Sequence, residues 1–221
     1  VRWNGYEKAD LNPGEAAKKN DALFLWTNPN APTGTLSAKK QIASFAKKFP
    51  GVVIVDEAYA DFASENCMEL AASKSNRNLI VMRTFSKSYS LAGLRVGYAV
   101  GPVDLIEAMD KVKDSYNIDA IAQAVALAAV KDQKWMKRNV AKVIKTRKRF
   151  TRELERLGWD VLPSEANFVF AKPPKNNAAE IFESLKKHNI FVRYFSGPKT
   201  CQRLRITIGT DAEMDRLLKF L

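Results

Sequence analysis

Histidine and cysteine are scarce in this sequence, which limits the catalytic and metal sites that it can form. The 221 residues include one histidine and two cysteines. A Ser-His-Asp or Cys-His arrangement would have to use that single histidine, and a site with several histidine ligands is excluded within one chain. The cysteines, Cys67 and Cys201, lie far apart and outside any CxxC pattern. This argues against a disulfide framework or a structural zinc site and is typical of a reducing compartment.

The single histidine, His188, favours a structural role. It stands near the end of a helical pattern in "ESLKKHNIF", where a cation interacts favourably with the helix dipole. If the protein is an enzyme, lysine or tyrosine would then have to carry its proton transfers.

Long apolar runs are also absent from the sequence. No run approaches the roughly 20 residues needed to span a bilayer, and the first residues lack the basic and apolar segments of a secretory signal. The cysteine usage predicts a cytoplasmic protein, and the absence of a long apolar run predicts that it has no membrane partner. The first residue is Val1 rather than methionine, and we expect the chain to be part of a longer protein.

Positive charge exceeds negative charge by 12 at pH 7, and the isoelectric point is near 9.7. Such a balance indicates either nucleic acid or an anionic small molecule as partner. The basic residues are spread over helical patterns, and the longest of these, 133–157, has an apolar face opposite its basic one. The apolar face consists of Met136, Val140, Val143, Ile144, Phe150, Leu154 and Leu157. No zinc-finger spacing, RRM aromatic motif or GXXG loop accompanies the charge, so we expect a small-molecule partner and no nucleic acid.

Short apolar runs alternate with helical patterns in the first part of the chain. The runs cover 22–26, 52–55, 79–82 and 95–100, and helical patterns cover 37–49, 103–114 and 119–131. Continuous apolar runs separated by helices are typical of a parallel sheet covered on both faces. The sequence therefore predicts an α/β fold with a mostly parallel sheet and helices on both of its faces.

The pattern changes along the long helix, which suggests a second and smaller α+β domain. Its predicted elements are strands 167–171, 191–195 and 203–208 and helices 177–188 and 211–220, with a proline-containing loop at 172–177. We expect a first domain over 1–138 and a second domain over 139–221.

Polar residues follow the first three apolar runs at their carboxyl ends. "ALFLW" continues into Asn28 and Asn30, "VVIV" into Asp56, and "LIVM" into "RTFSKS", which holds Lys87. In open parallel sheets, ligands bind outside the carboxyl ends of the strands. Turn-forming residues account for "NPNAPTG" taken alone, but an acid directly after four β-branched residues needs a cationic partner. The three ends together predict one ligand site.

These residue types suit pyridoxal 5′-phosphate (PLP). A neutral lysine amine forms a Schiff base with a carbonyl, and a carboxylate such as Asp56 keeps the pyridine nitrogen protonated so that the ring accepts electrons. The cofactor's phosphate requires hydroxyls and a guanidinium, which Ser86 and Arg95 could supply. Lys87, once displaced by substrate, could move a proton without any catalytic histidine.

Five motifs resemble the fold-type I PLP-dependent aminotransferases, and among these most closely the histidinol-phosphate aminotransferases. They are "NPNAPTG", "VDEAYADF", "TFSKSYSLAGLRVGYAVG", "VRYF" and "LRITIGT", which occur in the order of the family. The resemblance implies that Lys87 carries the Schiff base and that Asp56 and Tyr59 contact the cofactor's ring. It further implies phosphate contacts from Thr84, Ser86 and Arg95, and substrate contacts from Asn167, Arg193 and Arg205.

Two departures from the family's pattern affect these expectations. Many relatives carry an asparagine directly before "PTG", where this chain has Ala31, so Asn30 or Asn28 would have to substitute, and we favour Asn30 as the nearer. The glycine-rich phosphate turn, the stacking aromatic residue and the N-terminal arm that precede these motifs in the family are not found in the sequence. We therefore expect this chain by itself to bind PLP weakly and to have little or no activity.

The resemblance implies transfer of the amino group of L-histidinol phosphate to 2-oxoglutarate, in histidine biosynthesis, by an enzyme that is a homodimer when full length. Related PLP enzymes act on aromatic amino acids or decarboxylate threonine phosphate, and these remain alternatives. A further alternative is a basic binding module that retains the fold without the chemistry, although such a module has no need for both Lys87 and Asp56.

Overall fold

The computed structural model describes residues 23–175 and 177–221, and these form two compact units. The first, which we call the Lys87 unit, comprises 23–29 and 36–139 of the described residues. The second, the Arg205 unit, comprises 30–35, 140–175 and 177–221. Ala22, the first residue of the predicted strand 22–26, lies outside the described residues.

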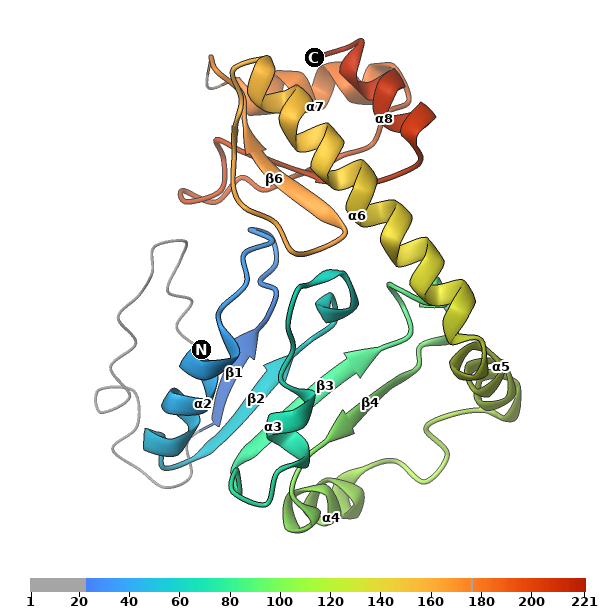
Figure 1. The fold of residues 1–221 in the computed structure, drawn as a ribbon. Coiled ribbons are helices and arrows are strands. Elements are labelled where there is room, and N and C mark those ends of the chain that lie inside the picture. The colour runs from blue at the N-terminus through green and yellow to red at the C-terminus, as the bar shows by residue number, and fades with distance from the viewer. Residues whose placement is uncertain (1–22, 176) are drawn as a thin grey trace. The chain divides into compact units, whose positions relative to one another are not determined.

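The Lys87 unit contains a four-stranded sheet of order β1-β2-β3-β4 (Figure 1). The strands are β1 (Leu23–Thr27), β2 (Val52–Asp56), β3 (Leu79–Thr84) and β4 (Gly97–Val100). The first three pair in parallel, as predicted, and β4 is antiparallel to β3. The chain returns directly from β3 to β4 with only a short turn of 3-10 helix at Ala92–Leu94, and a parallel neighbour would have required a longer crossover.

The predicted strand 95–100 starts two residues later in the structure. Arg95 has a left-handed backbone with φ of 55°, which ends the preceding turn and excludes it from the extended strand. Gly97 then begins β4, and a Cβ on this residue would lie 2.8 Å from the carbonyl oxygen of Arg83. The close approach of the two backbones therefore requires glycine at this position.

Two helices, α2 (Lys39–Lys48) and α3 (Met68–Ala72), enclose the core of the Lys87 unit with alternate residues of the strands. The buried residues that β2 and β3 contribute to this core are Val53, Val55, Leu79 and Val81. Aromatic rings join β1 to α2, with centroids of Phe24 and Phe45 4.6 Å apart, and such pairs contribute about 0.5–1.5 kcal/mol beyond their buried area. Leu23 and Leu25 of β1 are instead 62% and 51% exposed.

Three further helices follow, α4 (Val103–Val112), α5 (Ala120–Lys131) and α6 (Gln133–Arg156). Asp119 caps α5 by accepting a hydrogen bond of 2.8 Å from the Ala122 amide. On α6 the predicted apolar residues Met136, Phe150 and Leu154 are buried, but Leu157 is 47% exposed. The prediction was wrong for Leu157 because α6 ends at Arg156, and Gly158, with φ of 81°, continues in the left-handed conformation that often ends helices.

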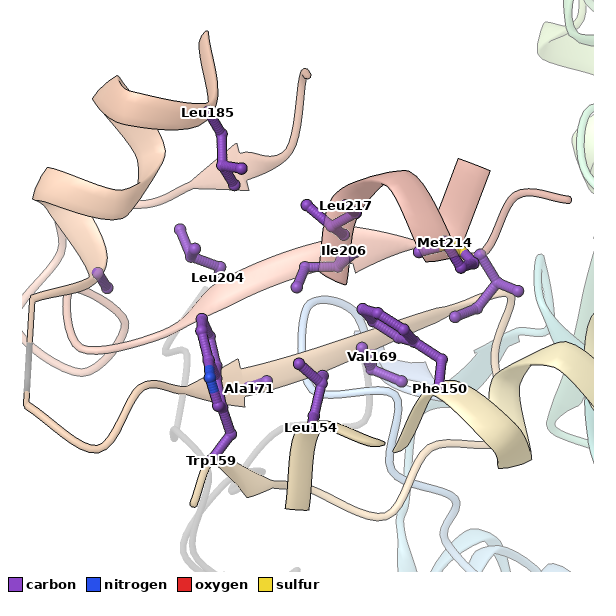
Figure 2. Close-up of a cluster of buried hydrophobic side chains, with 12 residues drawn as sticks. Phe150, Leu154, Trp159, Val169, Ala171, Leu185, Leu204, Ile206, Met214 and Leu217 are labelled. Carbon is purple, nitrogen blue, oxygen red and sulfur yellow. The ribbon is translucent and has the colours of Figure 1, made fainter. Parts of the chain in front are cut away.

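The Arg205 unit is an antiparallel sheet of order β5-β6-β8-β7 with helices α7 (Ala178–Lys187) and α8 (Asp211–Leu218). The strands are β5 (Asp160–Val161), β6 (Phe168–Lys172), β7 (Arg193–Tyr194) and β8 (Leu204–Thr207). Its core joins the end of α6 to the sheet and to the two helices, and Figure 2 shows Phe150, Leu154 and Trp159 next to the strands that carry Val169 and Ile206. Each fully buried large side chain contributes about 1.5–3 kcal/mol.

Residues 30–35, from the motif "NPNAPTG", belong to the Arg205 unit through their backbone contacts. The Gly34 amide donates to the Asn30 carbonyl at 2.7 Å, and the Glu165 amide donates to the Gly34 carbonyl at 2.8 Å. Gly34 has a left-handed backbone with φ of 79°, and a Cβ there would lie 2.4 Å from Ser164 Oγ. Glycine is therefore required at this position both by backbone conformation and by the neighbouring side chain.

We predict that Gly34→Ala lowers the free energy of unfolding by about 1–2 kcal/mol or more, from the left-handed backbone alone, with the contact to Ser164 adding to the loss. Gly93→Ala is the control, because a Cβ on Gly93 meets no atom within 4 Å. Urea unfolding followed by tryptophan fluorescence measures both variants. Equal stability of the two variants would contradict this account of Gly34.

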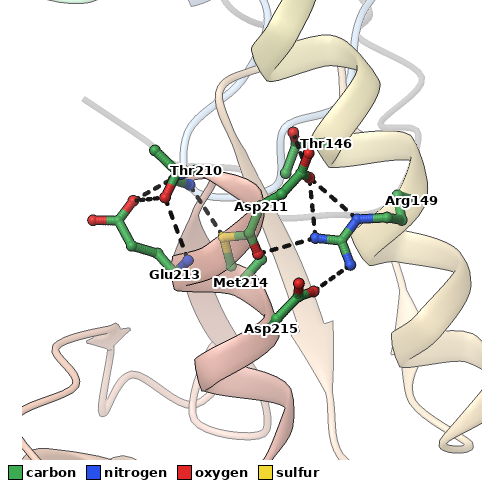
Figure 3. Close-up of polar contacts among 8 residues, drawn as sticks. Thr146, Arg149, Thr210, Asp211, Glu213, Met214 and Asp215 are labelled. Carbon is green, nitrogen blue, oxygen red and sulfur yellow. Dashed lines mark hydrogen bonds and ion pairs between the residues drawn. The ribbon is translucent and has the colours of Figure 1, made fainter.

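The first turn of α8 is held by carboxylates (Figure 3). Thr210 and Glu213 form a capping box, and Arg149 of α6 donates to Asp211 at 3.0 Å and to Asp215 at 2.6 Å. The Thr146 hydroxyl and the Arg149 guanidinium lower the pKa of Asp211, and the Thr210 amide and hydroxyl lower the pKa of Glu213. Both carboxylates therefore stabilise the folded unit in their charged form.

The stabilisation from these two carboxylates is present above their ordinary pKa values of 3.8 and 4.5 and is lost as the pH falls through their lower folded values. We therefore predict that the free energy of unfolding decreases as the pH is lowered from 6 to 3, and that the decrease is smaller in Glu213→Gln. Urea unfolding at several pH values measures this slope. Glu183→Gln, which changes an exposed carboxylate of α7, is the control and should keep the wild-type slope.

Candidate active site

The carboxyl ends of β1, β2 and β3 lie next to one another in the Lys87 unit. Thr27 pairs with Asp56, and Asp56 pairs with Met82. The ladder continues past the strand ends, where the Asn28 amide donates to the Asp56 carbonyl at 2.8 Å and the Glu57 amide donates to Met82 at 2.9 Å. The register thus brings the polar residues that follow β2 and β3 to one edge of the sheet.

A cavity of about 560 Å³ at this edge is lined by five of the predicted site residues, Asp56, Thr84, Ser86, Lys87 and Arg95. Tyr59, the sixth predicted residue of this unit, is close to them, since Lys87 Nζ lies 5.3 Å from the centroid of its ring. The lining therefore includes the carboxylate of Asp56, the amine of Lys87, the hydroxyls of Thr84 and Ser86 and the guanidinium groups of Arg83 and Arg95, and the phenol of Tyr59 lies beside the amine.

The hydroxyl and guanidinium side of the cavity is formed by the connection from β3 to β4. Thr84 Oγ1 donates to Ser86 Oγ at 2.9 Å and accepts the Ser86 amide at 3.1 Å, so the two hydroxyls lie side by side. A turn follows in which the Ser90 amide donates to the Lys87 carbonyl at 3.1 Å. Arg95 is exposed and donates to the Ala92 carbonyl at 2.7 Å.

The two asparagines that could replace the missing one at Ala31 have different environments. Asn28 is 2% exposed, and both ends of its amide bind the backbone of Ser37, at 2.7 Å and 3.1 Å. Asn30 belongs to the Arg205 unit, where its amide donates to Thr33 Oγ1 at 2.8 Å. Asn28 is thus committed to a structural contact, and Asn30 stays the predicted ligand.

A second cavity, of about 550 Å³, lies within the Arg205 unit and is lined by the predicted residues Arg193 and Arg205. The two arginines are directly opposite each other on β7 and β8. Both guanidinium carbons lie 5.5 Å from the centroid of the Phe195 ring. Like charges directly opposite across a strand pair are destabilising, so an anion bound between them would be stabilising.

Arg205 also has an unused donor. Its Nε is buried and has no hydrogen-bond partner among the residues that the structure describes. Its guanidinium carbon lies 5.2 Å from the Phe168 ring centroid, which holds the side chain against an apolar surface. A buried, unsatisfied donor costs about 1–3 kcal/mol, and an anionic ligand in this cavity would remove that cost. The predicted substrate residue Asn167 lines neither of the two cavities; its carbonyl accepts the Ile208 amide at 2.9 Å.

A buried group of charged residues beside the first cavity was not predicted. Arg83 forms ion pairs with Glu57 and Asp61 at 2.8 Å each. Burial raises the pKa of Glu57 despite the opposing effect of Arg83, and burial and Glu57 together raise the pKa of Cys67 to about 12. The signal in the sequence was the pair of charged residues, Glu57 and Arg83, placed at the ends of apolar strands.

The environment of the single histidine, His188, suits the structural role that the sequence indicated. It follows the last residue of α7, and its Nδ1 lies 2.9 Å from the Ser184 carbonyl. Within 23–175 and 177–221, no helix is long and apolar enough to cross a membrane, and no group of three or more histidine, cysteine or acidic residues could hold a metal ion.

The model of the family "Aminotransferase class I and II" matches residues 7–221. The chain belongs to this family. The histidinol-phosphate aminotransferase of Citrifermentans bemidjiense is 47% identical over 221 residues, which are 100% of this chain and 63% of that protein. The resemblance inferred from the five motifs is thereby confirmed.

Two solved structures support the fold. Histidinol-phosphate aminotransferase from Sinorhizobium meliloti in complex with PLP matches with a TM-score of 0.81 and 32% identity, over 89% of this chain and 55% of that one. L-threonine-O-3-phosphate decarboxylase from Porphyromonas gingivalis matches with a TM-score of 0.79 and 26% identity, over 94% and 65%. The predicted α/β fold of type I is confirmed, and this chain spans less than two thirds of the length of these relatives.

Proposed function

We propose that this chain is the PLP-binding and C-terminal part of a histidinol-phosphate aminotransferase of histidine biosynthesis. In this proposal, residues 1–138 belong to the large PLP-binding domain and 139–221 form the small C-terminal domain. The observation that supports it best is the lining of the first cavity, where Asp56, Lys87, two hydroxyls and Arg95 meet at the carboxyl ends of parallel strands. These are the groups that PLP requires of a protein, so the residues fit the cofactor.

The predicted cofactor residues have the following proposed roles, which for Tyr59 and Asn30 are given on the resemblance. Lys87 would bind PLP covalently, and its amine, once displaced by the substrate, would hold and move a proton. Asp56 keeps the pyridine nitrogen protonated, and Tyr59 and Asn30 donate to the ring hydroxyl. Thr84, Ser86 and Arg95 bind the phosphate. When bound, PLP supplies the electron sink that makes the amino group transferable.

The second cavity supports an anionic substrate. Arg205 offers a buried donor without a partner, and Arg193 lies opposite it. We assign Arg193 to the phosphate of L-histidinol phosphate and Arg205 to a carboxylate of 2-oxoglutarate or glutamate, because a planar guanidinium binds both kinds of group through paired hydrogen bonds. Asn167, at the start of β6, is a proposed substrate contact on the resemblance alone. The relative at 47% identity favours histidinol phosphate over threonine phosphate, whose decarboxylase matches at 26%.

We also propose that the full-length protein is a cytoplasmic homodimer. Helix α5 has only alanines, one glutamine and larger apolar residues before Lys131, and its Ile121 is 74% and Leu127 56% exposed. A helix that is apolar on all sides is normally buried, and an interface between two copies would bury it.

The proposed function predicts a yellow, borohydride-reducible absorption band after PLP is added to the wild-type chain, and loss of this band in Lys87→Ala. Borohydride fixes the cofactor to the lysine, and mass spectrometry of the peptides should place the label on Lys87. We expect weak binding by this chain and stronger binding by a full-length version, because relatives are longer than the chain.

Lys142→Ala, which changes an exposed lysine of α6, is the matched control and should leave the band unchanged. Labelling of Lys142 and Lys87 to the same extent would mean that the cofactor reacts with lysines at random. Absence of the band from the full-length protein as well would refute the proposed function.

From the positions of Arg193 and Arg205 we predict that inorganic phosphate stabilises the chain specifically. The anion should relieve the repulsion of the two arginines and bind the buried Nε, so phosphate should raise the melting temperature more than chloride at equal ionic strength. Arg205→Gln should abolish this difference. Arg203→Gln is the control, because Arg203 donates to the Asp160 carbonyl at 2.8 Å outside the cavity; equal stabilisation of both variants would show that phosphate binds elsewhere.

A further inference from the structure

The buried charged group beside the first cavity is organised around Arg83. Its side chain is 10% exposed and donates from Nε to Glu57 and from Nη1 to Asp61, both at 2.8 Å. The Glu57 side chain is completely buried, and that of Asp61 is 26% exposed. One guanidinium on β3 therefore binds two carboxylates of the segment that follows β2.

Each carboxylate also uses its second oxygen. Glu57 Oε1 accepts the amide of Cys67, and Asp61 Oδ2 accepts the hydroxyl of Ser88, which is 5% exposed. Arg83, Glu57, Asp61 and Ser88 thus form one continuous network, which we call the Arg83 network. It connects the segment 57–61 to β3 and to the turn after Lys87, which both lie more than 15 residues further along the chain.

Three of the four members of the Arg83 network are direct neighbours in sequence of proposed cofactor residues. Glu57 follows Asp56, Arg83 precedes Thr84, and Ser88 follows Lys87. Arg83 lines the first cavity, whereas Glu57, Asp61 and Ser88 are not among its lining within the described residues. These three can therefore affect a ligand in that cavity only through Arg83 and the residues beside them.

Stability alone does not account for such a network. Replacing a buried ion pair by apolar residues is often neutral or stabilising, because removing two charges from water is costly. The planar guanidinium instead fixes direction, since its donors form a rigid fork that holds each carboxylate in one orientation. Reacting groups must be held to within about 0.5 Å of their productive geometry, and a directional network meets this requirement better than apolar packing.

We propose that Arg83, Glu57, Asp61 and Ser88 are positioning residues that hold Asp56 and Lys87 at a fixed separation across the ends of β2 and β3. The inference rests on the proposed function for the identity of the ligand, PLP, but its structural part concerns the two backbone segments alone. Ser88 is the link of this network to the lysine, because its hydroxyl joins the Lys87 turn to Asp61.

Ser88→Ala tests the proposal with the smallest change, since it removes one hydroxyl and leaves both carboxylates bound to Arg83. A hydrogen bond to a charged group is lost, so PLP affinity, measured from the borohydride-reducible band, should fall about ten-fold. The same loss should occur in Asp61→Asn, and Ser88→Thr, which keeps the hydroxyl, should restore affinity toward the wild-type value.

Amide hydrogen exchange gives a readout that needs no cofactor. The amides of Ala60 and Phe62 report on the segment after β2, and those of Ser90 and Leu91 on the Lys87 turn, because each donates a backbone hydrogen bond there. Exchange at all four should accelerate in Ser88→Ala about ten-fold. Met214 in the first turn of α8, whose amide donates to the Thr210 carbonyl, should keep its wild-type rate.

Arg149→Gln is the matched control, because Arg149 likewise joins two carboxylates but lies in the Arg205 unit. It should accelerate exchange at Met214 and leave the Lys87 turn and PLP affinity unchanged. Wild-type affinity and exchange in both Ser88→Ala and Asp61→Asn would overturn the proposal, and so would a loss of affinity that Arg149→Gln reproduces.

The two proposals fail in different ways. If the wild-type protein takes up no PLP at Lys87, even at full length, the proposed function is refuted and hydrogen exchange alone decides the role of the network. Coupled acceleration at Ala60 and Ser90 would then still support a link between the two segments, and unchanged rates would overturn it.

Discussion

The parallel register of β1, β2 and β3 is the constraint on which the first cavity depends. Parallel strands all end at the same edge of a sheet, and the pairs Thr27 with Asp56 and Asp56 with Met82 align those ends residue by residue. Shifting β2 by one residue would turn Asp56 toward the core of the Lys87 unit and Val55 toward the cavity. The buried valines of β2 prevent this shift, because they fill the core only in the observed register.

The same register creates the need for the Arg83 network. A charged residue at the end of a buried strand must be paired or hydrated, and the edge of the sheet brings Glu57 and Arg83 close enough to pair at 2.8 Å. The network therefore neutralises the charges that the sheet places at the ends of its buried strands. Its residues also lie beside the proposed PLP residues, where they can orient them. The same side chains thus stabilise the fold and, in our proposal, position the residues that bind PLP.

The arginines of this basic chain perform different tasks that composition does not separate. Arg83 and Arg149 each bind two carboxylates, and Arg147, 5% exposed, donates to the Ala166 carbonyl at 2.6 Å. Arg193 and Arg205 instead face each other across two strands and line a cavity. The positive charge of the chain is thus partly structural and partly available to an anionic ligand, which agrees with the preference for a small molecule over nucleic acid.

The sequence by itself determined most of the elements, the mostly parallel sheet and the family, because apolar periodicity and short motifs are local properties of a chain. The short elements α3 and β5 were not predicted, since so few residues carry little of a pattern. The residues at the strand ends could also be identified, since parallel strands must bring Asp56 and Lys87 to one edge. Only the tertiary structure decided the antiparallel direction of β4, the exposure of Leu157, and the pairing of Arg83 with Glu57 and Asp61. These depend on where the chain turns and which distant residues then meet, and no local pattern contains that information. The same reason applies to Asn28, because the two hydrogen bonds of its side-chain amide to the backbone of Ser37 depend on how the chain between them turns.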